Sequence, residues 1–464
     1  MINVLKIIFT LLMLASIYVV INKKLQIPIS FLIIGFAGMI VGGLINGTLP
    51  LTNGSTGYLF FDLFEYFKQE GILENLKTVG MNMFAITGYV YYMNYLKASE
   101  LFALIIVKPL RRIKNKYILA GASYLLTTLL ILVIPNGMGR LALLFGITYP
   151  VMMACGVSKA TAATSILAAT GLSWGPANPQ VLNAYALSGL DSSNLDLVSH
   201  FATYESPWNF IAIVLSAAMF VTVSIVFDKK DGYTVEDTSN IELKDPKSLG
   251  IPMWWALFPV LPLVMILLFS SLVPATPNLG IPCVEYMCFT IVVVLVCLSS
   301  KDKVAAFNGG NQLFVSFGNN VANVISVVFA GSVFGKGIQM IGGFNLVLKP
   351  FLETDAPNIP LFIIVVGLVG AIIGFAGGSN FVPISVLGGA VKTLITTFGL
   401  NEHPFIIMMT GCYMPVMGMS PSTSFMAYSI NESGLDVGTM LKRCIPTQLI
   451  TITVFIIGAI MQLG

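Results

Sequence analysis

The residues best suited to bind a charged ligand interrupt an apolar stretch in the first half of the chain. Asn136, Gly137, Gly139 and Arg140 lie between two hydrophobic runs. Glycine lets backbone N–H groups approach an anion closely, and arginine binds a carboxylate in bidentate geometry, which lysine cannot do. An ionisable residue at membrane depth is costly and is usually functional. We therefore predict a carboxylate site here, with the alternative that Arg140 pairs structurally or extends to the membrane surface.

A second interruption of the same kind carries no charge. It consists of Gly377, Gly378, Ser379 and Asn380, which supply free amides, a hydroxyl and a carboxamide. These groups suit either a carboxylate or a cation held by carbonyl oxygens. We expect all four residues to contribute to the substrate site.

Two other apolar segments are long enough to cross a membrane but are broken in the middle. Unwound carbonyls and hydroxyls in such breaks can hold a coupling ion, and sodium is the possible metal here. The alternative is that the prolines only kink packed helices. We expect Asn178 and Thr423 to contact the substrate. The residues predicted to hold the coupling ion are Gly175 and Pro176 in the first break and Ser420, Pro421, Ser422 and Ser424 in the second.

The other polar residues do not form a constellation typical of an enzyme. His200 and His403 are too far apart in the chain to be assigned as a metal pair, and Gly331 to Lys336 lacks the spacing of a phosphate-binding loop. Glu285 is a candidate proton-coupling carboxylate, but we expect it to face water at a membrane boundary. The sequence thus predicts no enzyme and no cofactor, beyond a coupling sodium ion or proton.

The composition places these residues in a membrane protein. Of 464 residues 56% are hydrophobic and only 10% are charged, which is too few to cover an aqueous surface. The net charge of +3 is too small to suggest nucleic acid as a partner. The expected partners are the lipid bilayer and a small organic anion.

The interruptions recur because the chain contains two collinear copies of one pattern. Lys108-Pro109-Leu110 corresponds to Lys349-Pro350-Phe351, and Gly175-Pro176 corresponds to Ser420-Pro421. Paired, interrupted hydrophobic segments in two halves are typical of secondary transporters, with the substrate site at the bilayer midplane. We predict an all-α polytopic membrane protein built from inverted repeats, each with a re-entrant hairpin and a broken transmembrane helix.

The distribution of lysine and arginine supports the re-entrant interpretation. Most basic residues fall on one side of the membrane only if neither hairpin crosses it, as the positive-inside rule requires. The two copies then face opposite ways, and their tips meet near mid-membrane. The predicted organisation is N-terminal spans and an interfacial helix in 1–79, a first repeat in 80–227 (hairpin 117–156, broken helix 160–187), a cytoplasmic linker in 228–252, connecting spans in 253–318, and a second repeat in 319–464 (hairpin 359–399, broken helix 405–428).

Several short motifs give the chain a family resemblance over nearly its whole length. They are Ser55-Thr56-Gly57-Tyr58, Lys108-Pro109-Leu110, Tyr149-Pro150-Val151-Met152, Gly378 to Asn380, Ser420-Pro421 and Lys442-Arg443. In this order they resemble the DcuC-type anaerobic four-carbon dicarboxylate carriers of the ion-transporter superfamily. The resemblance implies efflux, exchange or cation-coupled transport of succinate, fumarate or malate across the bacterial inner membrane. The superfamily implies elevator-like motion and a homodimer.

Two departures from the family pattern concern the position of a positive charge. Family members carry a basic residue shortly before the Ser-Pro of the last broken span, where this chain has Met417 and Gly418. Conversely, Arg140 occupies a tip that is usually uncharged. Either the charge has moved between the tips or the cargo is another organic anion, such as a sugar acid, keto acid or amino-acid derivative. An ion channel is a further alternative, which predicts passive flux without saturation or exchange.

Overall fold

The computed structural model describes residues 2–463, except residues 24, 52, 136, 173, 189–195, 233–243, 344–345 and 347–357. The described residues form helices and connecting segments and contain no strand. Seven helical segments are long and apolar enough to cross a membrane: Ile27–Asn46, Lys116–Val133, Gly137–Ala154, Leu197–Lys230, Ile281–Ser299, Ile359–Gly377 and Val437–Met461. The chain is therefore an all-helical, polytopic membrane protein.

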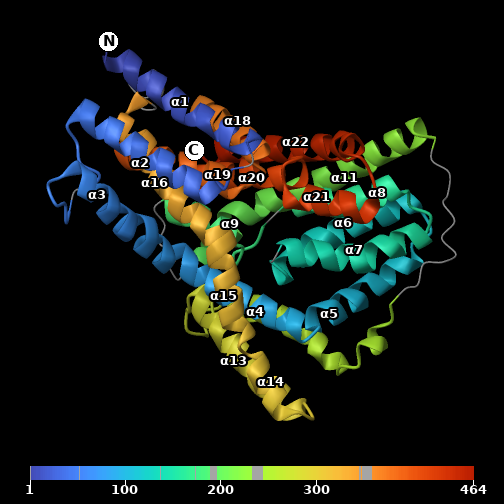
Figure 1. Cartoon of the computed structure of the whole chain (residues 1–464). Coiled ribbons are helices and arrows are strands. Elements are labelled where there is room, and N and C mark those ends of the chain that lie inside the picture. Colours follow the sequence, from blue (N-terminus) through green and yellow to red (C-terminus); the bar gives the residue numbers. More distant parts are fainter. Residues whose placement is uncertain are drawn as a thin grey trace.

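The N-terminal part contains one long helical segment that follows two apolar helices. Residues 59–95 remain helical throughout, because α3 continues through two π-helical segments, η1 and η2, into α4 (Figure 1). The Asp62 carboxylate accepts hydrogen bonds from the Thr56 backbone N–H at 2.7 Å and from its hydroxyl at 2.6 Å, which fixes the loop before α3. The bounds are α1 Ile2–Asn22, α2 Ile27–Asn46, α3 Leu59–Tyr66, η1 Phe67–Glu74, η2 Leu76–Gly80 and α4 Met81–Tyr95.

The first half continues with a helical pair and an interrupted helix. α6 begins after Asn115, whose side chain accepts the N–H groups of Tyr117 and Ile118, and α8 begins after Ser158, which caps Thr161 in the same way. α6 and α7 pack against each other. The bounds are α5 Ala98–Val107, η3 Lys108–Arg112, α6 Lys116–Val133, α7 Gly137–Ala154, α8 Lys159–Thr170 and α9 Pro179–Ser188.

The middle of the chain joins the two halves. α15 runs through the π-helical segment η7 into α16 as one long, continuous helix (Figure 1). The bounds are α10 Leu197–His200, η4 Phe201–Glu205, α11 Ser206–Lys230, η5 Pro246–Leu249, η6 Met253–Val260, α12 Leu261–Leu268, α13 Ile281–Ser299, α14 Lys303–Gly309, α15 Gln312–Asn320, η7 Val321–Ile325 and α16 Ser326–Ile341.

The second half again has a helical pair followed by an interrupted helix. Asn358, Thr423 and Asp436 cap the starts of α18, α21 and α22 with side-chain oxygens. The bounds are α18 Ile359–Gly377, α19 Phe381–Phe398, α20 His403–Tyr413, η8 Met414–Gly418, α21 Ser424–Ser433 and α22 Val437–Met461.

Glycines let α2 pack directly on the backbone of α16, far away in the sequence (Figure 1). A Cβ added at Gly35 would lie 2.7 Å from the Phe334 nitrogen, and one added at Gly42 would lie 2.5 Å from the Met340 carbonyl carbon. Small residues at helix contacts allow this close approach in membranes. The N-terminal helices are thereby fixed to the helix that precedes the second half.

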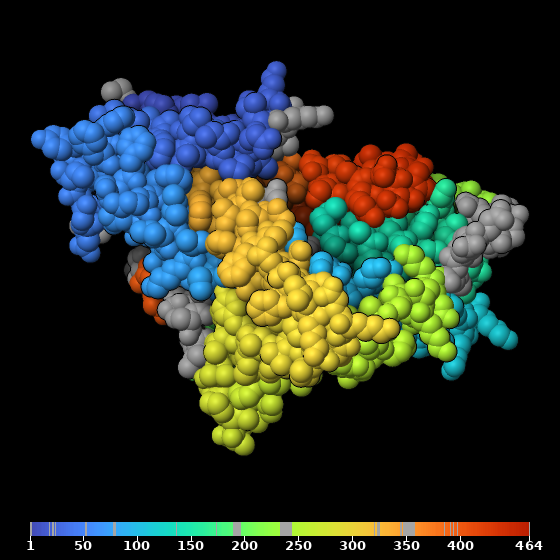
Figure 2. Space-filling model, turned by 60° about the horizontal axis from the view of Figure 1, so that its bottom comes forward, coloured from blue at the N-terminus to red at the C-terminus, as the bar shows by residue number. Residues whose placement is uncertain are grey.

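The two halves share one buried core. It contains residues from α4 to α9 together with residues from α18 to α22. Figure 2 shows N-terminal segments in blue, the middle of the chain in yellow and C-terminal segments in red side by side on one face. Segments distant in sequence therefore build common surfaces and cavities.

Candidate functional site

A cavity of about 590 Å³ lies between the two polar interruptions. It is lined by residues of both halves, so the structure brings the two interruptions together. The predicted site residues that line it are Gly137, Arg140, Gly377, Gly378, Ser379, Asn380, Ser422 and Ser424. Met417, near which the family resemblance implies a basic residue, lines the same cavity.

The N-terminal ends of four helices border this cavity. Its lining includes Gly137 of α7, Pro179 of α9, Phe381 of α19 and Ser424 of α21, each of which is the first residue of its helix. A helix N-terminus carries a partial positive charge and backbone N–H groups without intrahelical partners. Four such ends around one cavity favour an anion.

Arg140 adds a full positive charge to this cavity. Its side chain is 1% exposed, and its Nη1 donates a hydrogen bond to the Ile134 carbonyl at 2.6 Å. Its Nε is buried without a hydrogen-bond partner, and no carboxylate of the described residues balances its charge. A buried charge without a counterion is strongly unfavourable, so an anion in the cavity would stabilise this guanidinium.

The turn between α18 and α19 is held against the second helix break. Gly378 ends α18 with φ of 60°, and a Cβ added there would lie 2.4 Å from the Ser422 carbonyl oxygen. The Ser420 hydroxyl donates to the Phe375 carbonyl at 2.6 Å. Asn380 is 2% exposed and its Nδ2 has no partner, so it offers a second buried donor to the cavity.

The first helix break lies at a different, smaller cavity. Gly175, Pro176 and Asn178 line a space of about 20 Å³ together with Glu285 and Tyr89. Gly175 has φ of 114°, a backbone conformation that favours glycine. The Asn178 side-chain oxygen accepts the Gln180 backbone N–H at the start of α9. The 590 Å³ cavity therefore excludes Gly175, Pro176 and Asn178, although it is lined by Thr170 and Pro179 on either side of them.

The expectation that Glu285 faces water is wrong. Its side chain is 4% exposed in α13, and its Oε2 has no hydrogen-bond partner. The helix packs this carboxylate against the first break, where it lines the small cavity. The sequence alone could not reveal this burial. Glu285 lies close to the start of its helix, a position at which we expected an acid to face water.

Some predicted residues lie elsewhere, and other lining residues were missed. Gly139, Thr423, Ser420 and Pro421 do not line the large cavity, and Asn136 lies outside the described residues. The polar lining residues not predicted as site residues are Thr87, Tyr91, Thr170, Gln180 and Asn319. Their polarity within apolar helices was the available signal.

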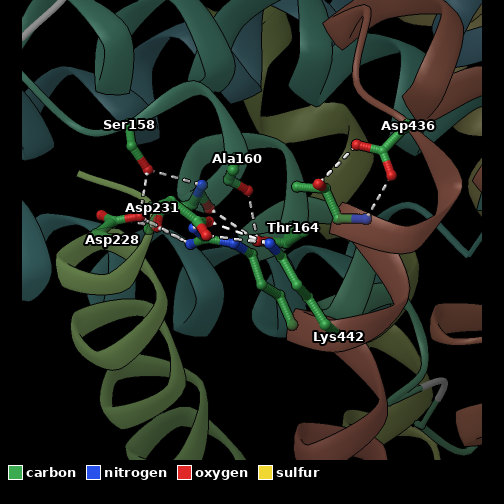
Figure 3. Close-up of polar contacts among 10 residues, drawn as sticks. Ser158, Ala160, Thr164, Asp228, Asp231, Asp436 and Lys442 are labelled. Atoms are coloured by element: carbon green, nitrogen blue, oxygen red, sulfur yellow. Dashed lines mark hydrogen bonds and ion pairs between the residues drawn. The ribbon is translucent and has the colours of Figure 1, made fainter. Parts of the chain in front are cut away.

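A buried ionic cluster lies apart from both cavities, where α8, α11 and α22 meet (Figure 3). Arg443 pairs with Asp228 at 2.8 Å and with Asp231 at 2.9 Å. Asp228 also accepts from the hydroxyls of Ser158 at 2.8 Å and Thr161 at 3.0 Å. The charges of Arg443, Asp228 and Asp231 balance within this cluster, and only the Arg443 Nε is buried without a partner. Such a charge-balanced network is typical of a structural connection.

Asp231 lies just beyond the end of α11, at the exposed edge of this cluster. Burial alone would raise the pKa of Asp231, but hydrogen bonds from Arg443 and Lys442 outweigh burial and lower it. Because its pKa is lower in the folded protein, its stabilising effect is present at neutral pH. That effect is lost as the pH falls through the folded-state pKa.

Comparison with known proteins gives a family match over almost the whole chain. Residues 3–464 match the DcuC family model, described as C4-dicarboxylate anaerobic carrier. The probable anaerobic C4-dicarboxylate transporter DcuC of Vibrio cholerae is 26% identical over 432 residues, which cover 90% of this chain and 89% of that protein. The anaerobic C4-dicarboxylate transporter DcuC of Escherichia coli K12 is 23% identical over 431 residues, with 90% of each chain covered.

Two solved transporter structures share the fold. The Alcanivorax borkumensis YdaH transporter superposes with a TM-score of 0.57 at 14% identity, covering 99% of this chain and 98% of that chain. Neisseria gonorrhoeae MtrF, described as one of a class of antimetabolite efflux pumps, gives a TM-score of 0.57 at 10% identity, with 97% of each chain covered. At these identities the likeness concerns the fold alone.

Proposed function

The chain belongs to the DcuC family of C4-dicarboxylate anaerobic carriers, and on this premise we propose that it is a secondary transporter of succinate, fumarate or malate in the bacterial inner membrane. The family resemblance expected from the sequence motifs is thereby confirmed. The family consists of membrane transporters and not of enzymes. Transport proceeds by efflux, exchange or cation-coupled movement.

The observation that carries the proposal is the unpaired Arg140 guanidinium at a cavity bordered by four helix N-termini. A four-carbon dicarboxylate has a carboxylate at each end, and the cavity has donors from both halves of the chain. Arg140 binds one carboxylate, and the amides of the second tip with Asn380 bind the other. A cavity of about 590 Å³ is in the range of small-molecule sites, roughly 300 to 1,000 Å³.

The shared lining also bears on the departures from the family pattern. Arg140 and Met417 border one cavity, so a positive charge at either position acts on the same ligand. This supports relocation of the charge over a change of cargo. Another organic anion, such as a sugar acid, keto acid or amino-acid derivative, is the second candidate substrate.

The inverted repeats and re-entrant hairpins also remain part of the proposal. The hairpin arms α6, α7 and α18 have the length of full spans, so length does not distinguish a crossing from a re-entrant path. Support comes from the positive-inside distribution and from the two tips that border one cavity. We propose that 80–227 and 319–464 are the repeats, that the hairpins move in an elevator-like manner, and that the carrier is a homodimer.

Two arrangements could couple transport to a cation. Hydroxyl and carbonyl oxygens at Ser420, Ser422 and Ser424 suit sodium. The buried Glu285, which lines the cavity at the first break, suits a proton. Transport with imposed sodium or proton gradients distinguishes the two, since each predicts stimulation by its own ion alone.

The experiment that tests the proposal is exchange in liposomes. Purified protein is reconstituted with internal labelled succinate, and efflux is followed with and without external fumarate, malate, gluconate or a sodium gradient. We expect external dicarboxylates to stimulate efflux saturably, because exchange is faster than return of an empty carrier. Liposomes without protein serve as the control.

The other outcomes discriminate between the alternatives. Exchange with gluconate but not with dicarboxylates would retain the carrier mechanism and replace the cargo. Linear, unsaturable flux without stimulation from the opposite side would indicate a channel and contradict the proposal.

A further inference from the structure

The only two histidines of the chain meet at one place in the fold. His200 ends α10 and His403 begins α20, and their ring centroids are 4.3 Å apart. Their separation in the chain gave no basis for assigning them as a metal pair, and only the fold shows that they meet. Folding brings together the end of one short helix in the first half and the start of another in the second.

Glu402 completes a set of three ligand groups. One nitrogen of each histidine and one carboxylate oxygen of Glu402 all lie within 4.8 Å of one another. Both nitrogens of His200 and the Nδ1 of His403 are buried without hydrogen-bond partners. Buried polar atoms normally have partners, so these unpaired nitrogens need an explanation.

Neighbouring groups hold the imidazoles in place. The Glu205 Oε1 lies 3.9 Å from the His200 Nδ1 and also accepts a hydrogen bond from the Tyr185 hydroxyl. Tyr204 stacks on His403, with ring centroids 3.7 Å apart and planes inclined by 12°. A carboxylate beside one nitrogen of a metal-binding histidine orients the ring and leaves the other nitrogen for the metal.

We propose that His200, His403 and Glu402 bind a divalent transition-metal ion of the zinc class. Two imidazoles and one carboxylate are ligands that Zn²⁺ prefers, whereas Ca²⁺ and Mg²⁺ prefer oxygen alone. Tetrahedral ligands at about 2.0 to 2.1 Å from zinc lie roughly 3.4 Å apart, so side-chain shifts of about 1 Å would close the set. A water molecule fills the fourth position.

The site lies near the protein surface and outside the large cavity. The side chains of His200, His403 and Glu402 are 12%, 18% and 28% exposed, so an ion can reach them. None of the three lines the 590 Å³ cavity. The metal therefore joins α10 to α20 and stabilises the contact between the two halves, without taking part in substrate binding.

Metal binding is tested directly on purified protein without a histidine tag. The protein is stripped with a chelator and titrated with Zn²⁺ by calorimetry, and Co²⁺ is added separately to read its ligand-field spectrum. We expect one site per chain with a tetrahedral Co²⁺ spectrum, and a higher melting temperature with Zn²⁺. His200→Ala and His403→Ala should each weaken binding by at least about 10-fold. Glu432→Gln, an exposed acid elsewhere, should leave it unchanged.

Two controls keep the outcome unambiguous. Cys283 is exposed and its thiol is a potential competing metal ligand, so Cys283→Ser is measured in parallel and should retain the site. His200→Gln with His403→Gln preserves side-chain size if the alanine variants fail to fold, and circular dichroism with size-exclusion chromatography reports whether the fold is intact. Equal Zn²⁺ affinity in this double variant and the original protein, or loss of binding in Cys283→Ser, would overturn the proposal. Neither result depends on which anion is transported.

Discussion

At the scale of single residues, the environment of Arg140 explains why its charge should matter for transport. Its guanidinium is buried at the cavity. Within the described part of the chain its Nη1 donates a hydrogen bond to the Ile134 carbonyl, and no carboxylate pairs with it. An unpaired buried charge lowers stability, and a bound carboxylate removes that penalty. Pairing with Arg140 can therefore contribute favourable binding free energy for a carboxylate.

Replacing Arg140 tests this directly. Arg140→Gln should reduce succinate exchange by at least about 100-fold, because charged hydrogen bonds contribute about 1.5 to 3 kcal/mol each. Its melting temperature should not fall, since a buried unpaired charge is removed. Arg140→Lys is the matched control, with the charge kept but the bidentate geometry lost, and should retain intermediate activity. Wild-type exchange in Arg140→Gln would exclude the assignment.

A second substitution tests whether the positive charge has moved. Met417→Arg in the Arg140→Gln background places the charge at another position in the lining of the same cavity. We expect it to restore at least about one tenth of the lost exchange rate, because the field at the ligand is recovered although the geometry is not. Met417→Gln in the same background is the uncharged control. Equal rates in both double variants would argue against relocation.

The sequence predicted part of this site from residue type alone. Arg140 and Gly377 to Asn380 stood out because polar or charged groups interrupt apolar runs. Asn319 and Gln180 were not distinguishable in that way, because a polar residue in a membrane helix serves interhelical hydrogen bonds equally well. Only tertiary packing shows that they border the cavity.

At the scale of helices, the second tip depends on one glycine. Gly378→Ala places a Cβ 2.4 Å from the Ser422 carbonyl oxygen, so the tip must move away from the second break. We expect loss of exchange together with lower thermal stability. Gly399→Ala is the matched control, because Gly399 also ends a helix with φ of 59° but has nothing near its Cβ position. That control should cost only about 1 to 2 kcal/mol and retain exchange. Normal exchange in Gly378→Ala would contradict the proposed role of this contact.

The ionic cluster makes a separate prediction about the helix connections. Arg443→Gln leaves Asp228 buried without its partner and should destabilise the protein by about 3 to 5 kcal/mol. Lys442→Gln, at the neighbouring and half-exposed position, should cost less than about 1 kcal/mol. Thermal melting in detergent compares the two. Similar melting temperatures would show that the buried pair adds little.

The sequence predicted the ends of helices wherever a helix-breaking proline or glycine lies at the end itself. Pro135 follows α6, and α8 and α9 are separated around Gly175 and Pro176. The sequence did not predict that the chain stays helical from Leu59 to Tyr95. A charged face in this segment also suits a surface helix, and π-helical turns have no clear local signature.

At the scale of the whole molecule, the two halves meet in ways that no local pattern specifies. Matching the two copies predicted which positions correspond, but it did not predict which residues of the two halves lie close together in space. The contact of His200 with His403 and the common cavity both depend on how the halves pack. These features became visible only with the tertiary structure.

The proposed inverted arrangement predicts opposite access to the outer ends of the two hairpins. In a cysteine-depleted background, Lys114→Cys and Asn401→Cys each introduce one thiol at an exposed position beside a hairpin. A membrane-impermeant maleimide should modify the first from the cytoplasmic side and the second from the outside. Met138→Cys, which lines the cavity, is the comparison whose labelling succinate should slow. Labelling of both outer positions from one side only would contradict the inverted arrangement.

The four helix ends around the cavity have a consequence for how such carriers diverge. Partial charges that belong to peptide units do not depend on side-chain identity and do not titrate. Drift in sequence can therefore replace most lining side chains while the electrostatic preference for an anion persists. A binding site of this kind is preserved as long as the backbone fold is preserved. A sequence alignment would show few conserved residues at it.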